Sequence, residues 1–182
     1  YQIKSGRLSG DYVARAFPKP PTNARGLIAE ARGASEEEAI AALHEVIDAR
    51  EIRRTKERRI DETTGLTVPS IEEYLEALDQ VTLSRPQHAM LTALALSEDD
   101  GLSEQRMANA AGYKSRSSAN RAFAAAGLLI ASYLAIEMPS EEQPENPAGS
   151  SVLGLRGVPK KDDAPGNWIL FRELREAVRL YA

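Results

Sequence analysis

The stretch SEQRMANAAGYKSRSSANRAFAAAG, residues 103–127, decides the fold of this chain. Ser103 precedes a short helix-favouring run that ends at Gly112, and a longer run of this kind begins near Ser115. A serine before a helix accepts hydrogen bonds from the first backbone N–H groups, and a glycine after a helix supplies the positive φ of a tight turn. Two helices joined by a turn of about four residues form a helix-turn-helix. The stretch therefore predicts this unit.

The second helix of the unit has an apolar face and a polar face. Its predicted buried seam recurs at helical spacing and consists of Ala119, Phe123, Ala126 and Ile130. A rotation of about 100° per residue then places Ser117 and Arg121 on the opposite face, with Asn120 on its flank. The candidate contact residues near this face are Lys114, Ser115, Arg116, Ser117, Asn120 and Arg121.

These side chains suit duplex DNA. Between Glu104 and Glu137 the chain has four basic residues and no acidic one, although its formal net charge is −4. Arginine pairs with guanine and asparagine with adenine, while serine and lysine reach phosphates. The N-terminal half of a recognition helix is the part that enters the major groove. The pattern predicts a DNA contact here, and an ordinary helical hairpin with a polar first turn remains the alternative.

The sequence after this helix predicts a wing. Residues 151–158 and 167–171 are expected to be two strands of a hairpin, and a closing helix follows. Helices followed by such a hairpin form a winged helix-turn-helix. Lys160 and Lys161 lie near the expected tip, where they would contact backbone phosphate. Trp168 lies within an apolar strand and is expected to pack under the hairpin.

Two segments are expected to join this domain to the N-terminal part. Residues 50–60 carry six basic and two acidic side chains, which favours a solvated helix end over a phosphate-contacting stretch. Residues 61–69 are predicted to be a linker. Capping-box spacing at Ser70 and Ser84 then predicts two helices, so the winged domain is expected to span 70–182.

The N-terminal part has the pattern of a small β-β-α domain. Residues 11–17 and 25–32 are predicted strands, and Ser35 with Glu38 has the spacing of a capping box before an amphipathic helix. The domain is expected to span residues 1–60. The expected fold class is therefore α+β and mostly α: a small N-terminal β-sheet plus a helix, followed by a winged helix-turn-helix domain.

The composition excludes several classes of site. The 182 residues include no cysteine, so disulfides, zinc ribbons, iron–sulfur sites and thiol nucleophiles are excluded. Two histidines, His44 and His88, leave little for a metal site or a Ser–His relay. We expect no catalytic residue, metal or cofactor. No apolar run approaches the roughly 18 residues of a membrane span, and no signal peptide is evident, so a cytoplasmic protein that does not cross the membrane is expected.

The sequence AAGYKSRSSAN (110–120), with the preceding HAMLTAL (88–94), resembles a winged-helix module found beside HNH-type nuclease domains in modification-dependent restriction proteins of bacteria. The resemblance covers about residues 70–180. It implies that this module inspects DNA, while the HNH domain of such proteins cuts it. This chain lacks the Cys and His residues that an HNH site uses, so a nuclease role would need a partner or a longer parent polypeptide.

The N-terminal part is similar to another family. Two strands followed by GLIAEARGASEEEAIAALHEVID (26–48) resemble the small domains of HicB-like antitoxins. In those proteins an N-terminal domain grips a partner protein and a C-terminal domain binds operator DNA. The resemblance implies that residues 1–60 contact a protein partner or form a homodimer.

Three classes of function follow from these observations. The leading hypothesis is a non-enzymatic protein that binds double-stranded DNA, inspecting modified or foreign DNA in a restriction, phage-defence or transcription-regulation setting. The alternative is a protein–protein adaptor, or an inhibitor of a nucleic-acid-handling complex encoded by a mobile element. A carboxylate-only hydrolase is the third class, which is disfavoured because carboxylates such as Glu36 and Glu38 suit helix starts.

Overall fold

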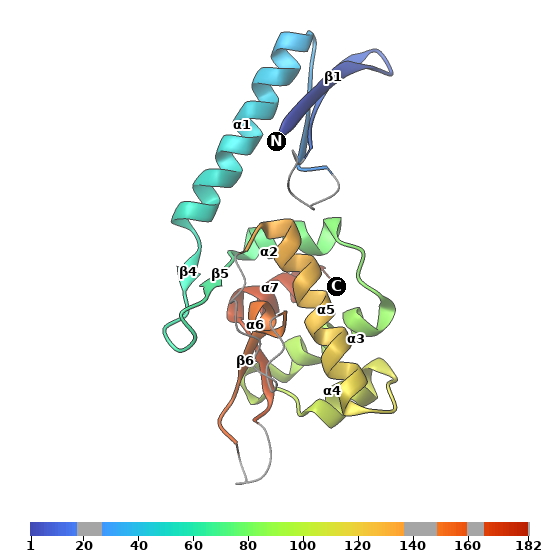
Figure 1. Cartoon of the computed structure of the whole chain (residues 1–182), viewed down its shortest axis with the longest axis vertical. Coiled ribbons are helices and arrows are strands. Elements are labelled where there is room, and N and C mark those ends of the chain that lie inside the picture. Colours follow the sequence, from blue (N-terminus) through green and yellow to red (C-terminus); the bar gives the residue numbers. More distant parts are fainter. Residues whose placement is uncertain (18–26, 137–148, 160–165, 182) are drawn as a thin grey trace. The chain divides into compact units, whose positions relative to one another are not determined.

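The protein is mixed α+β and mostly helical, as the sequence predicts. The computed structural model describes residues 1–17, 27–136, 149–159 and 166–181. The chain divides into two compact units, Tyr1–Glu57 and Arg58–Ala182, which are described separately below (Figure 1).

The N-terminal unit is a three-stranded antiparallel sheet with one helix. Its strands β1 (Gln2–Leu8), β2 (Asp11–Phe17) and β3 (Ala29–Gly33) pair in the order β1-β2-β3. The helix α1 (Glu36–Lys56) lies along one face of this sheet (Figure 1). Strand β1 adds to the two strands that the sequence predicts. Only Ile3 of β1 is even half-buried, so the strand lacks the alternating apolar pattern that identifies a strand from sequence.

The core of this unit has small side chains at its centre, and the larger side chains of Ile3, Tyr12, Ile28, Ile40 and Ile47 pack partly buried around them. Its buried residues are Ala14, Ala16, Ala29, Ala39 and Leu43. Alanines on the sheet let the backbone of α1 lie close to the strands. Gly33 marks the closest approach, because a Cβ atom there would overlap the backbone of Glu38 and Ala39.

The start of α1 differs in one detail from a capping box. The Ser35 hydroxyl accepts a hydrogen bond from the Glu38 N–H, as the spacing predicts. The Glu38 carboxylate, however, accepts from the N–H of Ala34, one residue before the cap. Three acidic residues in the first turn and three basic residues in the last turn complement the helix dipole.

The segment expected to be a linker is instead a closed hairpin in the C-terminal unit. Strands β4 (Arg59–Ile60) and β5 (Thr67–Val68) pair, and Asp61 organises the turn between them. Its carboxylate accepts hydrogen bonds from the N–H groups of Thr63 and Thr64 and from the Thr64 hydroxyl. Burial alone would raise the pKa of Asp61, but these hydrogen bonds and one from Arg59 outweigh it and lower the pKa below its usual value.

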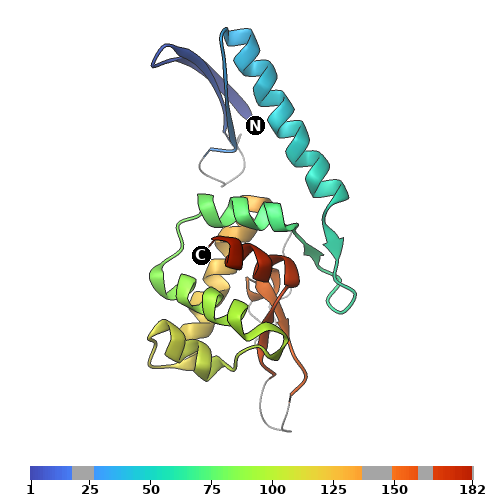
Figure 2. The same ribbon diagram turned by 180° about the vertical axis from the view of Figure 1, so that it is seen from behind.

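Five main helices form the C-terminal unit. They are α2 (Ile71–Gln80), α3 (Arg85–Ser97), α4 (Glu104–Ala111), α5 (Arg116–Leu134) and α7 (Arg172–Tyr181), and a 3₁₀ turn, η1 (Glu98–Asp100), follows α3 (Figures 1 and 2). Serines precede the first four, as predicted: Ser70, Ser84, Ser103 and Ser115. The helices enclose one hydrophobic core that includes Phe123 and Trp168.

The predicted hairpin after α5 is present. Strands β6 (Gly154–Arg156) and β7 (Trp168–Leu170) are antiparallel. Leu102, between α3 and α4, bridges Trp168 through two backbone hydrogen bonds of 2.9 Å. The hairpin thus follows the three helices α3, α4 and α5 and also pairs with the segment before α4. This arrangement is that of a winged helix-turn-helix. Lys160 and Lys161, the predicted tip residues, lie outside the described residues.

The first predicted wing strand is shorter than expected. Ser150–Leu153 is a single helical turn, α6, and the strand begins only at Gly154. Val152 and Leu153 are both buried, which an alternating strand with one exposed face does not allow. The turn packs closely on α5, because a Cβ atom at Gly127 would overlap the carbonyl oxygen of Gly149. Long-range packing therefore overrides the local strand preference here.

Candidate nucleic-acid interface

The turn between α4 and α5 has the geometry that its sequence predicts. Gly112 has φ +74°, a left-handed conformation that favours glycine. The N–H of Tyr113 donates to the carbonyl of Ala108 at 2.8 Å and closes the end of α4. The Ser115 hydroxyl accepts a hydrogen bond from the Ser118 N–H at 3.1 Å and caps α5. These contacts fix where the first turn of α5 begins.

The two faces of α5 are confirmed. The four predicted seam residues Ala119, Phe123, Ala126 and Ile130 are at most 1% exposed. Ser117 and Arg121 are exposed, and so are Lys114, Ser115 and Arg116 at the start of the helix. The structure thus brings most of the candidate contact residues to the surface at one end of α5.

The cations at this end of α5 have no partner within the described part of the chain. Lys114, Arg116 and Arg121 take part in no ion pair or hydrogen bond there, so their donors face solvent. Five of the ten arginines of the same unit are instead paired with carboxylates: Arg58, Arg59, Arg156, Arg175 and Arg179. Lys114 and Arg121 therefore present positive charge to solvent, whereas Arg116 is exposed but also attracts the Glu104 carboxylate.

Asn120 and Ser115 play a different part from the exposed cations. Asn120 is half-buried, and its side chain hydrogen-bonds Glu104 at the start of α4. Its Oδ1 atom is buried and has no partner among the described residues. Ser115 uses its hydroxyl for the helix cap and for a 2.9 Å hydrogen bond to the Ser118 hydroxyl. Both residues hold the position of α5 rather than presenting free groups to solvent.

A cluster that the sequence does not reveal joins α4, α5 and the wing. The Arg156 guanidinium forms an ion pair of 2.5 Å with Glu104. Arg156 also lies over the indole of Trp168, 4.4 Å from the ring centroid, and Trp168 contacts Phe123 with the ring centroids 5.3 Å apart. Trp168 is 2% exposed, which confirms that it packs under the hairpin. Residues 104 and 156 are too far apart in sequence for a local pattern to pair them.

The charge of Glu104 depends on this cluster. Burial alone would raise the pKa of the Glu104 carboxyl. Hydrogen bonds from Arg156 and Asn120, with the electrostatic attraction of Arg156 and Arg116, outweigh burial and hold the pKa below its usual value of 4.5. Glu104 therefore stays ionised in the fold to a lower pH than in the unfolded chain.

This depressed pKa predicts an acid-sensitive contribution to stability. Because the folded pKa lies below the unfolded value, Glu104 contributes stability that is fully present above about pH 4.5 and is lost as the pH falls through the folded pKa. Denaturant unfolding of the wild type and of Glu104→Gln between pH 3 and pH 7 measures this. The stability difference between the two proteins is expected to shrink below about pH 4.5. A difference that is constant over this range would contradict it.

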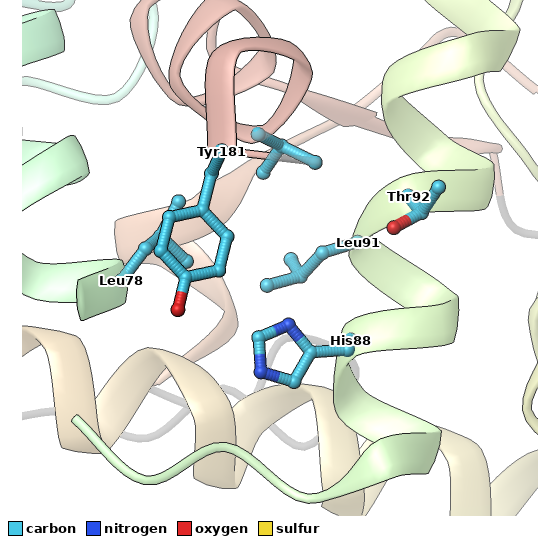
Figure 3. A pocket seen from close by; sticks show the side chains of 6 residues that line it. Leu78, His88, Leu91, Thr92 and Tyr181 are labelled. Carbon is cyan, nitrogen blue, oxygen red and sulfur yellow. The ribbon is translucent and has the colours of Figure 1, made fainter.

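A second feature of the unit is a small pocket between α2, α3 and α7. Its volume is about 160 Å³, and His88 and Tyr181 face one another across it, with ring planes 6° apart and centroids 6.1 Å apart (Figure 3). Its other lining residues are Leu78, Leu91, Thr92 and Val178. His88 thus packs against an aromatic ring. The described residues contain no group of three His, Cys, Asp or Glu side chains that would hold a metal ion.

Comparison of the chain with protein-family models, with curated proteins and with solved structures finds no match. The resemblances to restriction-associated winged helices and to HicB-like domains therefore stay predictions. Over the described ranges, no helix combines the length and apolar character needed to cross a membrane.

Proposed function

We propose that this protein binds double-stranded DNA without catalysing a reaction, placing the N-terminal half of α5 in the major groove. The observation that carries the proposal is the exposed set Lys114, Arg116 and Arg121, whose donors have no internal partner among the residues described. Side chains at this end of a recognition helix reach base edges and phosphates. A restriction, defence or regulatory setting follows only from the resemblances.

The structure supports different roles for the predicted contact residues. Arg121 and Arg116 carry the planar guanidinium groups that recognise guanine or phosphate in pairs of hydrogen bonds. Lys114 and Ser117 are exposed beside them and suit phosphate contacts. Ser115 caps the start of the helix, and Asn120 hydrogen-bonds Glu104 of α4. In this proposal Lys160 and Lys161 of the wing contact adjacent backbone phosphates.

The double variant Arg116→Ala/Arg121→Ala tests the proposal. If Arg121 contacts a base, its loss costs on the order of 1–3 kcal/mol of binding free energy. The plot of log affinity against log salt has a negative slope, and each lost phosphate contact makes this slope shallower by about 0.9. Fluorescence anisotropy with labelled random duplex DNA over a salt series measures the non-specific affinity. The same measurement with duplexes selected for tight binding to the wild type measures the sequence-specific affinity.

The matched control is Arg85→Ala/Arg172→Ala. These arginines are also exposed and unpaired within the described residues of the same unit, but they lie at the starts of α3 and α7. Their replacement removes the same charge and is expected to leave the affinity for DNA close to that of the wild type. Equal affinities for both double variants and the wild type would contradict the proposal, and absence of DNA binding at low salt would favour the protein–protein adaptor.

A further inference from the structure

One outer side of α3 carries a leucine that the fold leaves uncovered. Leu96 is 74% exposed, the largest fraction for any large apolar side chain on a described helix. His88 and Thr92 lie eight and four residues before it. A rotation of about 100° per residue therefore places all three residues on the same side of the helix. We call His88, Thr92 and Leu96 the α3 seam.

The same side of α3 borders the small pocket described above. His88 and Thr92 line this pocket of about 160 Å³ together with Tyr181 of α7 (Figure 3). Its other lining side chains are buried and apolar: Leu78, Leu91 and Val178. A pocket of this size and lining suits one aliphatic side chain. Leu96 of the same chain lies one helical turn beyond Thr92 and stays exposed, so it does not fill the pocket.

The two ends of α3 carry opposite charges. Arg85, its first residue, is exposed and takes part in no ion pair within the ranges that the structure describes. Residues 98–100, directly after the helix, are three exposed carboxylates. Arg179 and Arg175 pair with the first two, whereas Asp100 has no such partner among the described residues. An antiparallel copy of α3 would therefore be complementary to this helix in charge.

We propose that a second copy of this chain packs on the α3 seam, with the two α3 helices antiparallel around a two-fold axis at Thr92. In a two-fold interface the same patch serves both copies. About this axis, Leu96 of each copy lies level with His88 of the other and enters the pocket there. Arg85 of each copy lies level with position 99 of the other, beside the free Asp100. One arrangement thus uses the exposed leucine, the pocket and the unpaired charges.

The proposed dimer is weak and reversible. One pair of helices is expected to bury less than the roughly 1,200–2,000 Å² of a stable specific interface. Its apolar anchors are the two Leu96 side chains, because exposed ion pairs such as those of Arg85 add little affinity. The variant Arg85→Ala/Arg172→Ala is therefore expected to keep its dimer and to remain a valid control for DNA binding. The dimer goes beyond the proposed function, since the α3 seam includes no residue of α5.

Sedimentation equilibrium of the full chain from about 1 µM to about 1 mM tests the proposal over the range of weak association. The wild type is expected to show a monomer–dimer equilibrium. Leu96→Glu is expected to raise the dissociation constant on the order of a hundredfold, because each dimer loses two buried leucines and each contributes about tenfold. Circular dichroism checks that the variant stays folded.

The matched control is Leu180→Glu, which makes the same exchange at a leucine that is 69% exposed in the same unit. Leu180 lies five residues from Arg175, which pairs with Asp99 after α3. Helical rotation therefore turns Leu180 to the other side of α7. Its dissociation constant is expected to equal that of the wild type.

A disulfide tests the position of the two-fold axis. The chain has no cysteine, so Thr92→Cys introduces a single thiol in each copy. A disulfide joins Cα atoms about 4.4–6.8 Å apart. Mild oxidation is therefore expected to yield a covalent dimer of Thr92→Cys. Thr82→Cys, at an exposed threonine before α3, is expected to yield none at the same concentration.

Three results would overturn the proposal. A wild type that stays monomeric throughout the series would show that no second copy occupies the pocket. A dimer that Leu96→Glu does not weaken, or that Leu180→Glu weakens equally, would place the interface elsewhere. Equal disulfide yields from Thr92→Cys and Thr82→Cys would refute the two-fold axis. Each result leaves the α5 proposal standing on its own data, because none of these measurements contains DNA.

Discussion

Replacing Glu73 by alanine is expected to lower the free energy of unfolding of the C-terminal unit by about 3–5 kcal/mol. Glu73 and Arg58 form a bidentate ion pair with a shortest distance of 2.6 Å, and their side chains are only 5% and 9% exposed. Arg58 also donates to the carbonyl of Leu134 at the end of α5. Without Glu73 the buried guanidinium has lost its counter-charge, and the reciprocal cap of α2 at Ser70 is lost with it.

Urea unfolding followed by tryptophan fluorescence measures this effect, because the chain has one tryptophan and it lies in the C-terminal unit. The control Glu176→Ala removes a carboxylate that is 40% exposed from the Arg179 pair of the same unit and is expected to cost less than about 1 kcal/mol. The double variant Arg58→Met/Glu73→Leu removes both charges and is expected to be more stable than Glu73→Ala. A loss below about 1 kcal/mol for Glu73→Ala would show that the Arg58–Glu73 ion pair is exposed to solvent, in contrast to its buried position in the structure.

Replacing Trp168 by alanine is expected to cost a similar amount, about 3–5 kcal/mol. The indole is the largest side chain of the core, and it lies between Phe123 of α5 and Arg156 of β6. Its removal leaves a cavity at the junction of both elements. The guanidinium of Arg156 also loses the ring over which it lies.

Circular dichroism in a urea series measures the stability of this variant, since its fluorescence probe is gone. Trp168→Phe keeps an aromatic ring at the same place and is expected to lose less than half as much. The backbone bridge between Leu102 and Trp168 does not depend on the side chain, so both variants can keep the hairpin. Equal stability of the alanine variant and the wild type would refute the packing described for this junction.

The parts of this fold that sequence reasoning predicts are those that local chemistry decides. Serine caps at Ser70, Ser103 and Ser115 mark helix starts because the bond that each makes lies within three residues. The seam through Phe123 and the exposed position of Arg121 follow from helical periodicity alone. The same logic predicts the two sides of α5 and therefore most of the candidate site.

The parts that sequence reasoning missed depend on contacts between distant residues. Arg58 and Arg59 belong to a charged run that favours a solvated helix end, but their partners Glu73 and Glu173 are 15 and 114 residues away. Asn120 is of a residue type that reads bases, and only its hydrogen bond to Glu104 in the fold shows that its side chain turns inward. No local pattern encodes such pairings.

The alanine-built core of the N-terminal unit has a thermodynamic consequence. Alanine removes little apolar area from water when it is buried, and a unit of this size buries a smaller share of its surface than a larger domain does. We therefore expect the folded and unfolded forms of the unit to differ less in free energy than those of a larger domain. A ligand that binds only the folded form adds its own binding free energy to this difference, so occupancy and folding of the N-terminal unit are linked by mass action.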